Sequence, residues 1–169
     1  MSGRAPLTFG GVIPFAYDTD GSLHFLLGRE KYGRDSGHWS GFAGREERFD
    51  GGNLLHTAAR EGFEESCGLL GSESDLRHIL SNKAIQYRTT HGLHFLLPFQ
   101  FISYMPVMFA GAQAAVSASG AIADRSKFLE KDAVAWFPAH RVLRDRTLFI
   151  RPGFSADIEG IMDAISRRQ

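Results

Sequence analysis

The segment Leu54–Cys67 constrains the fold of this chain more than any other, because its sequence strongly favours a helix. Asn53 is a suitable N-cap, and the alanines and glutamates that follow it have high helix propensity. Gly62 weakens the helix by about 1 kcal/mol relative to alanine. Gly68 stands where a helix-ending glycine is expected. One side of the predicted helix is small or apolar enough to pack on a sheet, through Leu55, Ala59, Gly62, Phe63 and Ser66.

Another face of this predicted helix is acidic. Glu61, Glu64 and Glu65 are separated by three and four residues, and a helix advances about 100° per residue, so they share one face. Their Cβ atoms would lie roughly 5–6 Å apart, and the carboxylates would repel one another. Solvation with scattered salt bridges relieves this repulsion, and so does a divalent cation such as Mg²⁺. For an isolated acidic helix the solvated face is the commoner outcome. The choice between a solvated face and a metal site therefore depends on the residues upstream of the helix.

The rest of the chain predicts short strands mixed with helices. Turns at residues 18–21 and 90–92 each separate two β-rich segments. Two glycines and Pro14 in the first β-rich segment predict an edge, bulged or pocket-lining strand. The predicted strands are Phe9–Tyr17, Leu23–Gly28, Ala84–Thr89, Leu93–Ser103 and Ala133–Phe137.

The segments between these strands are polar or small. Arg29–Gly37 predicts a loop, Asp75–Leu80 predicts a helical turn, and Ala110–Gly120 is compatible with a loop or a short helix. Apolar residues recur at helical spacing in Ser155–Ile165, and Ser155 is the predicted cap of this last helix. Because strands and helices mix without strict alternation, the predicted fold class is α+β with a mixed sheet.

Length and charge narrow the function. A chain of 169 residues suits a single domain, residues 1–169, with residues 1–8 as a loose terminus. Lysine and arginine total 19, as do aspartate and glutamate, which argues against a broad nucleic-acid surface. A local nucleotide site remains compatible with a neutral total, as does a homodimer.

The single cysteine, Cys67, cannot form an internal disulfide, which is typical of a reducing compartment. The N-terminus has no long apolar segment, and no run approaches the roughly 20 apolar residues of a membrane span. We therefore expect a cytoplasmic protein without a membrane partner. A buried, inert thiol is the preferred interpretation of Cys67 over a reactive one.

The helix and the segment before it resemble the box of the Nudix hydrolase family. That box is a glycine, five residues, an acidic residue, seven residues and then Arg-Glu-apolar-x-Glu-Glu-x-Gly-apolar. Trp39 with Phe42-Ala43-Gly44 resembles the aromatic-glycine lead-in, and Ala135–Pro138 resembles the strand end before the last helix. The residues that match the box itself are Gly44, Asp50, Arg60, Glu61, Glu64 and Glu65.

The chain departs from the family pattern at three places. Nine residues separate Asp50 from Arg60, two more than in the family. Gly62 replaces an apolar residue. After the last glutamate, either Gly68 is one position late or Cys67 stands in for the glycine.

The resemblance implies an α/β/α sandwich and a pyrophosphohydrolase that depends on Mg²⁺ or Mn²⁺. Its substrate would be a nucleoside diphosphate linked to another moiety. Glu64 and Glu65 would bind the metal ion, and Glu61 would be a further ligand or the base for the attacking water. The family pattern gives Arg60 the role of orienting the glutamates, the Gly44 carbonyl that of another ligand, and Asp50 the place of an upstream glutamate.

Two alternatives remain open at the level of sequence. The first is hydrolysis of an RNA cap or an inositol pyrophosphate, suggested only by a group of late arginines: Arg141, Arg144, Arg146 and Arg151. The second is a non-catalytic nucleotide-binding or regulatory module that kept the fold, suggested by the altered spacing. Three repelling acids on one helix face argue against the second, because a binding module has no need of them.

Several residues outside the box are candidates for the substrate site, although a surface or core role is at least as common for each. Arg29, Trp39, Phe42 and Glu130 are the predicted substrate contacts, and Lys31, Tyr32 and Arg34 follow Arg29 on the same loop. An acid from a late loop joins catalysis in many family members, and the candidates here are Asp124, Glu130 and Asp132. His91 and His94 would point to opposite faces of a strand, so a zinc pair is not expected.

Overall fold

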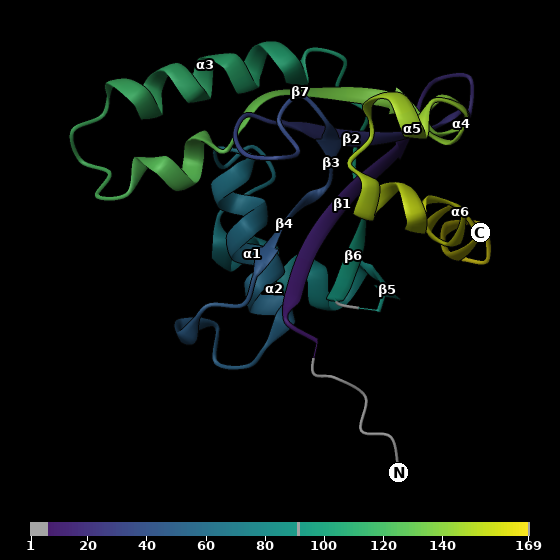
Figure 1. Cartoon of the computed structure of the whole chain (residues 1–169), viewed down its shortest axis with the longest axis horizontal. Helices are drawn as coiled ribbons and strands as arrows, with labels where there is room; N and C mark the ends of the chain where they lie inside the picture. Colours follow the sequence, from purple (N-terminus) through teal and green to yellow (C-terminus); the bar gives the residue numbers. More distant parts are fainter. Residues whose placement is uncertain (1–6, 91, 169) are drawn as a thin grey trace.

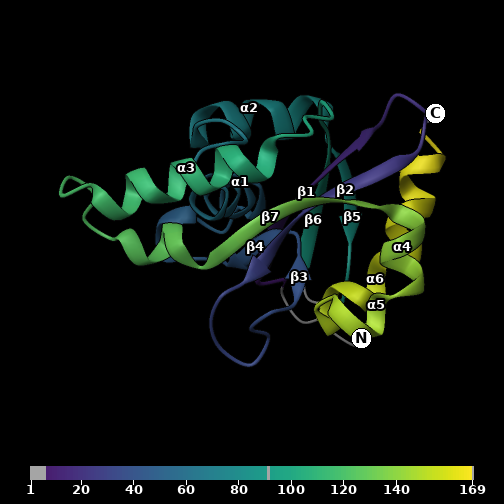
Figure 2. The ribbon, with the colours of Figure 1, turned by 90° about the horizontal axis from the view of Figure 1, so that it is seen from above.

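The computed structural model describes residues 7–90 and 92–168, and within them the chain forms a seven-stranded mixed sheet between two layers of helices. Helices α1, α2 and α3 cover one face, and α4, α5 and α6 lie on the other (Figures 1 and 2). The predicted α+β class with a mixed sheet is confirmed. The predicted loose terminus, residues 1–8, lies mostly outside the described residues.

The first strand, β1 (Phe9–Tyr17), is at the centre of the sheet. It runs antiparallel to β2 (Leu23–Glu30) and β4 (Phe42–Arg45), and parallel to β6 (Gly92–Pro98). Of the predicted possibilities for this strand, an edge strand is therefore wrong, whereas a pocket-lining strand is confirmed, because Phe9 lines a cavity. Its glycines serve close packing: a Cβ on Gly10 would lie 2.5 Å from the Leu54 carbonyl of α1.

The remaining strands are β3 (Trp39–Ser40), β5 (Ile85–Arg88) and β7 (Lys131–Pro138). They complete the sheet in the order β3-β2-β1-β6-β5, with β4 paired to β1 and β7 paired to β2. Phe9–Tyr17 keeps its predicted bounds, three further predicted strands keep their places with shifted ends, and Leu93–Ser103 ends earlier, at Pro98. The last strand begins two residues before its predicted start, because Lys131 pairs with Glu30.

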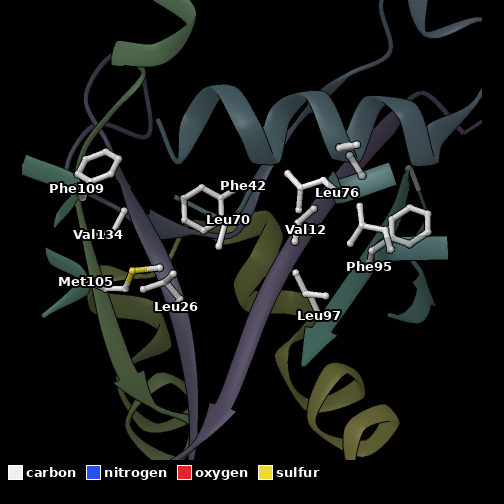
Figure 3. Packing of buried hydrophobic residues seen from close by; sticks show 13 residues of the cluster. Val12, Leu26, Phe42, Leu70, Leu76, Phe95, Leu97, Met105, Phe109 and Val134 are labelled. Carbon is white, nitrogen blue, oxygen red and sulfur yellow. The ribbon is translucent and has the colours of Figure 1, made fainter. Parts of the chain in front are cut away.

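One helical layer consists of α1 (Leu54–Glu65), α2 (Glu73–Lys83) and α3 (Met105–Ala118). The Asn53 side chain caps α1 by accepting a hydrogen bond from the Leu55 amide, as predicted. The predicted turn at 75–80 is a full helix, stabilised by a capping box between Ser72 and Asp75. Figure 3 shows part of the apolar core between this layer and the sheet, in which Val12, Leu26 and Phe42 of the sheet pack in one cluster with Leu70, Leu76 and Phe109.

The opposite layer consists of α4 (Ala139–Arg144), α5 (Arg146–Phe149) and α6 (Pro152–Ser166). The predicted cap Ser155 was wrong, because α6 begins one turn earlier with proline in its first turn, where a missing amide costs nothing. The apolar spacing of Ile158, Ile161 and Ile165 packs α6 on the sheet as predicted. Among the described residues, no helix has the length and apolar character needed to cross a membrane.

At the end of α1, both residues that could correspond to the family's glycine adopt a backbone conformation that favours glycine. Cys67 has φ of 53°, the left-handed conformation that favours glycine, and Gly68 follows with φ of 79°. The Gly68 amide donates to the Phe63 carbonyl, which closes the last helical turn. The Cys67 side chain occupies this position with its thiol donating to the Phe128 carbonyl at 3.2 Å. Burial raises the pKa of this thiol to about 11, as expected for an inert cysteine.

We expect the Cys67→Gly variant to be more stable than Cys67→Ala by about 1 kcal/mol, because both lose the thiol but only alanine keeps the strain of a left-handed backbone. Urea unfolding of the two variants measures the difference. The matched control is Ala114→Gly in the interior of α3, where glycine should destabilise. A Cys67→Ala protein as stable as Cys67→Gly would contradict the assignment of backbone strain to this residue.

Candidate metal and catalytic site

Arg60 of α1 lies at the centre of a buried network of carboxylates, beside the acidic face of this helix. The whole residue is only 3% exposed. It donates to both carboxylate oxygens of Asp50, at 3.2 and 3.0 Å, and to the Arg45 carbonyl at 3.0 Å. It also donates to Glu61 at 2.7 Å and to Glu64 at 3.1 Å. Arg60 therefore ties the loop before α1 to two glutamates of the helix.

Asp50 lies in the lengthened loop and is 1% exposed. Its carboxylate accepts hydrogen bonds from the Thr57 hydroxyl at 3.0 Å and from the Glu47 amide at 2.8 Å, in addition to those from Arg60. These hydrogen bonds outweigh the cost of burial and lower the pKa of Asp50. With this many partners, Asp50 anchors Arg60 and has little freedom to bind a metal ion.

Glu61 occupies space that exists only because residue 44 is glycine. A Cβ on Gly44 would fall 2.1 Å from Glu61 Oε1. The predicted ligand Gly44 thus lies directly against the predicted ligand or base Glu61. Burial raises the pKa of Glu61 to about 7, although the Arg60 cation opposes the shift; the negative charges of Glu64 and Glu130 add to it.

Glu64 lies at the more open side of the network. Besides Arg60, it faces Lys127, whose Nζ is 4.0 Å from Glu64 Oε1 and 2.8 Å from Glu47 Oε1. Burial raises the pKa of Glu64, and the two cations oppose this. Lys127 keeps about a quarter of its side chain exposed, so it places a positive charge at the rim of the site.

Glu65 faces a different set of partners from the other two glutamates. Its Oε2 accepts a hydrogen bond from the Ala43 amide at 2.8 Å, and its Oε1 lies 3.5 Å from the Nζ of Lys131. The Nζ of Lys131 also contacts Glu30 and donates a hydrogen bond to the Ser40 hydroxyl oxygen at 3.0 Å. Burial raises the pKa of Glu65 to about 8, against the opposing effect of Lys131.

The donor chemistry of this site fits Mg²⁺ or Mn²⁺, which prefer carboxylate and carbonyl oxygens. Glu61 and Glu64 share the Arg60 guanidinium, and the missing Cβ of Gly44 lets the Glu61 carboxylate lie directly against the Gly44 backbone. Within residues 7–90 and 92–168, however, no three acidic, histidine or cysteine side chains are already arranged around a metal position. Arg60 lies between Glu61 and Glu64, so these two carboxylates must turn away from it to bind an ion.

We expect the metal-free protein to lose about 2 kcal/mol of stability as the pH rises from about 6.5 to about 8.5. Glu61 and Glu65 have raised pKa values, so the folded chain retains protons that the unfolded chain has lost, and a rising pH favours unfolding. The loss of stability that these two glutamates cause begins once the pH rises past the ordinary pKa of a glutamate side chain. Below pH 6.5 it is opposed by His94, whose burial lowers its pKa to about 4.

Urea unfolding at each pH in the presence of a chelator measures this slope. Saturating Mn²⁺ should remove much of it, because the ion favours the ionised carboxylates. A Glu61→Gln/Glu65→Gln double variant serves as the control and should show a flatter profile. Equal stability of the chelated wild-type protein at both ends of the range would contradict the prediction.

The predicted substrate contacts outside the box are not gathered at one place. Arg29 forms an ion pair with Asp132 at 2.7 Å and lies over the ring of Trp39. Phe42 is fully buried in the core beneath α1, which leaves it no surface for a substrate. Glu130 is exposed at the start of β7.

The three candidate acids from the late loop also lie in different surroundings. Asp132 is bound by Arg29, and Asp124 is exposed and accepts a hydrogen bond from Ser126. Of the three late acids, Glu130 is the one whose charge acts on Glu61. Although the residue as a whole is exposed, partial desolvation of its carboxyl group raises its pKa. The structure therefore brings Glu130, rather than the other two, into the electrostatic field of the site.

The late arginines do not form a single basic patch. Arg141 and Arg144 both face Asp145, and Arg146 pairs with Glu159 at 2.8 Å. Arg151 donates to Asp35 at 2.8 Å and lies 3.6 Å from Glu30. Each arginine thus has an acidic neighbour, which removes the sequence feature that suggested a capped RNA or an inositol pyrophosphate.

A cavity of about 350 Å³ lies on the face of the sheet opposite α1, between the ends of several strands and the start of α6. Its wall includes Phe9, Ala43, His94, Arg151 and Phe154. Among the described residues, the Nδ1 atom of His94 is buried without a hydrogen-bond partner. His91 lies outside the described residues. Ala43 joins the cavity to the acidic site, because its backbone amide holds Glu65.

Sequence analysis missed the residues that complete the network: Glu30, Ser40, Glu47, Thr57, Lys127 and Lys131. Lys131 is the most informative omission, because a lysine that is fully buried is rare and needs partners. A charged residue at the start of an apolar strand was the available signal.

Comparisons with known proteins identify the fold. A scan against models of protein families finds no match, and a search of curated proteins finds no relative. Among solved structures, an Ap4A hydrolase from C. elegans, in a binary complex, is 12% identical and superposes with a TM-score of 0.54, over 95% of this chain and 98% of that one. A Nudix hydrolase from M. smegmatis, RenU, is 11% identical with a TM-score of 0.53, over 96% and 87%.

These similarities extend over nearly the whole chain, and they agree with the α/β/α arrangement around the mixed sheet. The protein therefore has the Nudix hydrolase fold. At identities this low the likeness concerns the fold alone, so the activity must be argued from the residues of the site.

Proposed function

We propose that this protein is a metal-dependent pyrophosphohydrolase that cleaves the phosphoanhydride of a nucleoside diphosphate linked to another moiety. The observation that carries the proposal is the buried cluster in which Glu61 and Glu64 share Arg60 beside Gly44. Burying carboxylates together costs free energy, and such costly groupings of like charge are typical of functional sites. The cluster also coincides with the predicted box residues on the first helix of a Nudix fold.

The proposed metal-binding groups are the carboxylates of Glu61 and Glu64 and the carbonyl of Gly44, and Glu65 lies beside them on the same helix face. A bound Mg²⁺ or Mn²⁺ neutralises diphosphate charge and lowers the pKa of a water molecule. Glu61 has a raised pKa suited to accepting a proton near neutral pH. Arg60 positions both glutamates, and Lys127 at the rim offers a positive charge to an approaching phosphate.

The cavity beyond Ala43 is the proposed place for the nucleoside. Its volume of about 350 Å³ is within the range of small-molecule sites, and it combines aromatic rings with the Arg151 guanidinium. Phe9 and Phe154 offer surfaces for a base, while Arg151 and His94 offer polar groups. These features support a nucleotide-type small molecule as the substrate.

A panel assay tests the proposal. The full chain is incubated with nucleoside diphosphate derivatives that carry a sugar, a second nucleotide or a pantetheine arm, together with Mg²⁺ or Mn²⁺. Products are separated by ion-exchange chromatography. We expect cleavage of at least one derivative by the wild-type protein and loss of that product with Glu64→Gln or with a chelator. Saturable nucleotide binding without turnover of any derivative would support the non-catalytic module instead.

A further inference from the structure

Lys131 is an unusual feature of the site, because a fully buried ammonium group lies directly beside the acidic helix. Its stem runs across Gly28 of β2, where a Cβ would lie 3.0 Å from the lysine Cγ and Cδ atoms. The glycine thus provides the space that lets this side chain reach the interior. At the end of the stem, Nζ contacts Glu30, Ser40 and Glu65.

The two halves of the acidic face differ in how firmly their carboxylates are held. Glu61 and Glu64 share Arg60, which retains Asp50 and the Arg45 carbonyl if both glutamates turn towards an ion. Arg60 therefore does not become an unpaired buried charge. This half of the face can release two carboxylates at small cost.

Glu65 is not released so easily. One of its oxygens accepts the Ala43 amide, and the other faces Lys131. If Glu65 turned away, the Ala43 amide would lose its acceptor and Lys131 would lose one of its two carboxylate partners. Leaving buried donors unsatisfied in this way is unfavourable. A divalent ion bound at Glu65 would also be repelled by the adjacent ammonium group.

We infer that Lys131 takes the place of a metal ion at Glu65, so that Glu61 and Glu64 bind the divalent ion while Glu65 serves to position Lys131, Ala43 and the end of α1. This inference rests on the proposed function and changes the predicted role of Glu65 from metal ligand to positioning residue. It makes Lys131, together with Glu30 and Ser40, a fixed part of the site.

The inference is tested by measuring how tightly the full chain binds Mn²⁺ in the absence of substrate. Electron paramagnetic resonance reports the fraction of the ion that is bound. We expect Glu64→Gln to weaken Mn²⁺ binding by at least about tenfold, and Glu65→Gln to change it by less than about threefold. A Glu65→Gln/Lys131→Met variant removes both charges and should also bind Mn²⁺ nearly as the wild-type protein does. Circular dichroism and thermal unfolding establish that each variant is folded, and Glu73→Gln on exposed α2 controls for weak surface binding.

The single variant Lys131→Met leaves Glu30 and Glu65 without their cation, and we expect it to bind one additional Mn²⁺ ion per chain. If Glu65→Gln weakened Mn²⁺ binding as much as Glu64→Gln does, the inference would be overturned while the proposed function remained intact. An unchanged number of bound ions in Lys131→Met would overturn it as well. Absence of saturable Mn²⁺ binding to the wild-type chain would overturn both the inference and the proposed function.

Discussion

Replacing Arg60 by methionine is expected to lower the free energy of unfolding by about 3–5 kcal/mol, the range observed when one partner of a buried ion pair is removed. Methionine fills much of the same volume but offers no hydrogen-bond donors. Asp50, which is 1% exposed, would lose two of its hydrogen bonds, and Glu61 and Glu64 would lose the cation between them. Much of the loss is therefore the cost of burying unpaired carboxylates.

Urea unfolding at neutral pH with a chelator present measures this change. The matched control is Arg77→Met on α2, because Arg77 also pairs with a glutamate four residues away but is exposed to solvent. That variant should change stability by less than about 1 kcal/mol, as exposed helix pairs do. Similar effects of the two substitutions would show that the buried network contributes no more than a surface pair.

The second large effect is expected in catalysis. On the proposed function, Glu61→Gln should lower kcat by about 10²- to 10⁴-fold at saturating Mn²⁺, because glutamine cannot accept a proton from the attacking water and is a poorer ligand for the ion. The measurement is steady-state hydrolysis of whichever panel substrate the wild-type protein cleaves. A variant with kcat within about threefold of wild type would exclude Glu61 as the base.

Gly44→Ala tests the same carboxylate without changing its chemistry. The added methyl group would overlap Glu61, so the side chain must move, and we expect kcat to fall although every acidic residue is retained. Gly120→Ala is the control, since a Cβ there meets no heavy atom of the described chain within 4 Å. Full activity of Gly44→Ala would indicate that the position of Glu61 is not critical.

The acidic helix was the part of the molecule most open to prediction from sequence, because its signals are local. An N-cap at Asn53 and spacings of three and four residues depend on helix geometry alone, and the structure reproduces them. The central position of β1 was not predictable in this way. Its glycines and Pro14 predicted an edge, bulged or pocket-lining strand, whereas the glycines also permit close approach of α1 and of neighbouring strands from elsewhere in the chain.

Lys131 illustrates a second limit. The pairing of β2 with β7 shifts register between Arg29 and Glu30, so that Ala133 pairs with the first and Lys131 with the second. Asp132 is the extra residue of this irregularity, and it turns Lys131 towards Gly28 and the acidic helix. Strict alternation along the strand cannot reveal such a change of face. Its partners Glu30 and Glu65 are also brought together only by tertiary structure.

The pairing of β2 with β7 has a consequence for how the protein is made. The two strands are separated by most of the chain, and pairings of this kind close large loops and slow folding. During synthesis, Glu30 and Glu65 emerge from the ribosome long before Lys131. Until β7 arrives, β2 exposes an unpaired edge, and the two carboxylates lack the ammonium group that neutralises them in the folded protein. Completion of the acidic site is therefore a late event in the life of the nascent chain.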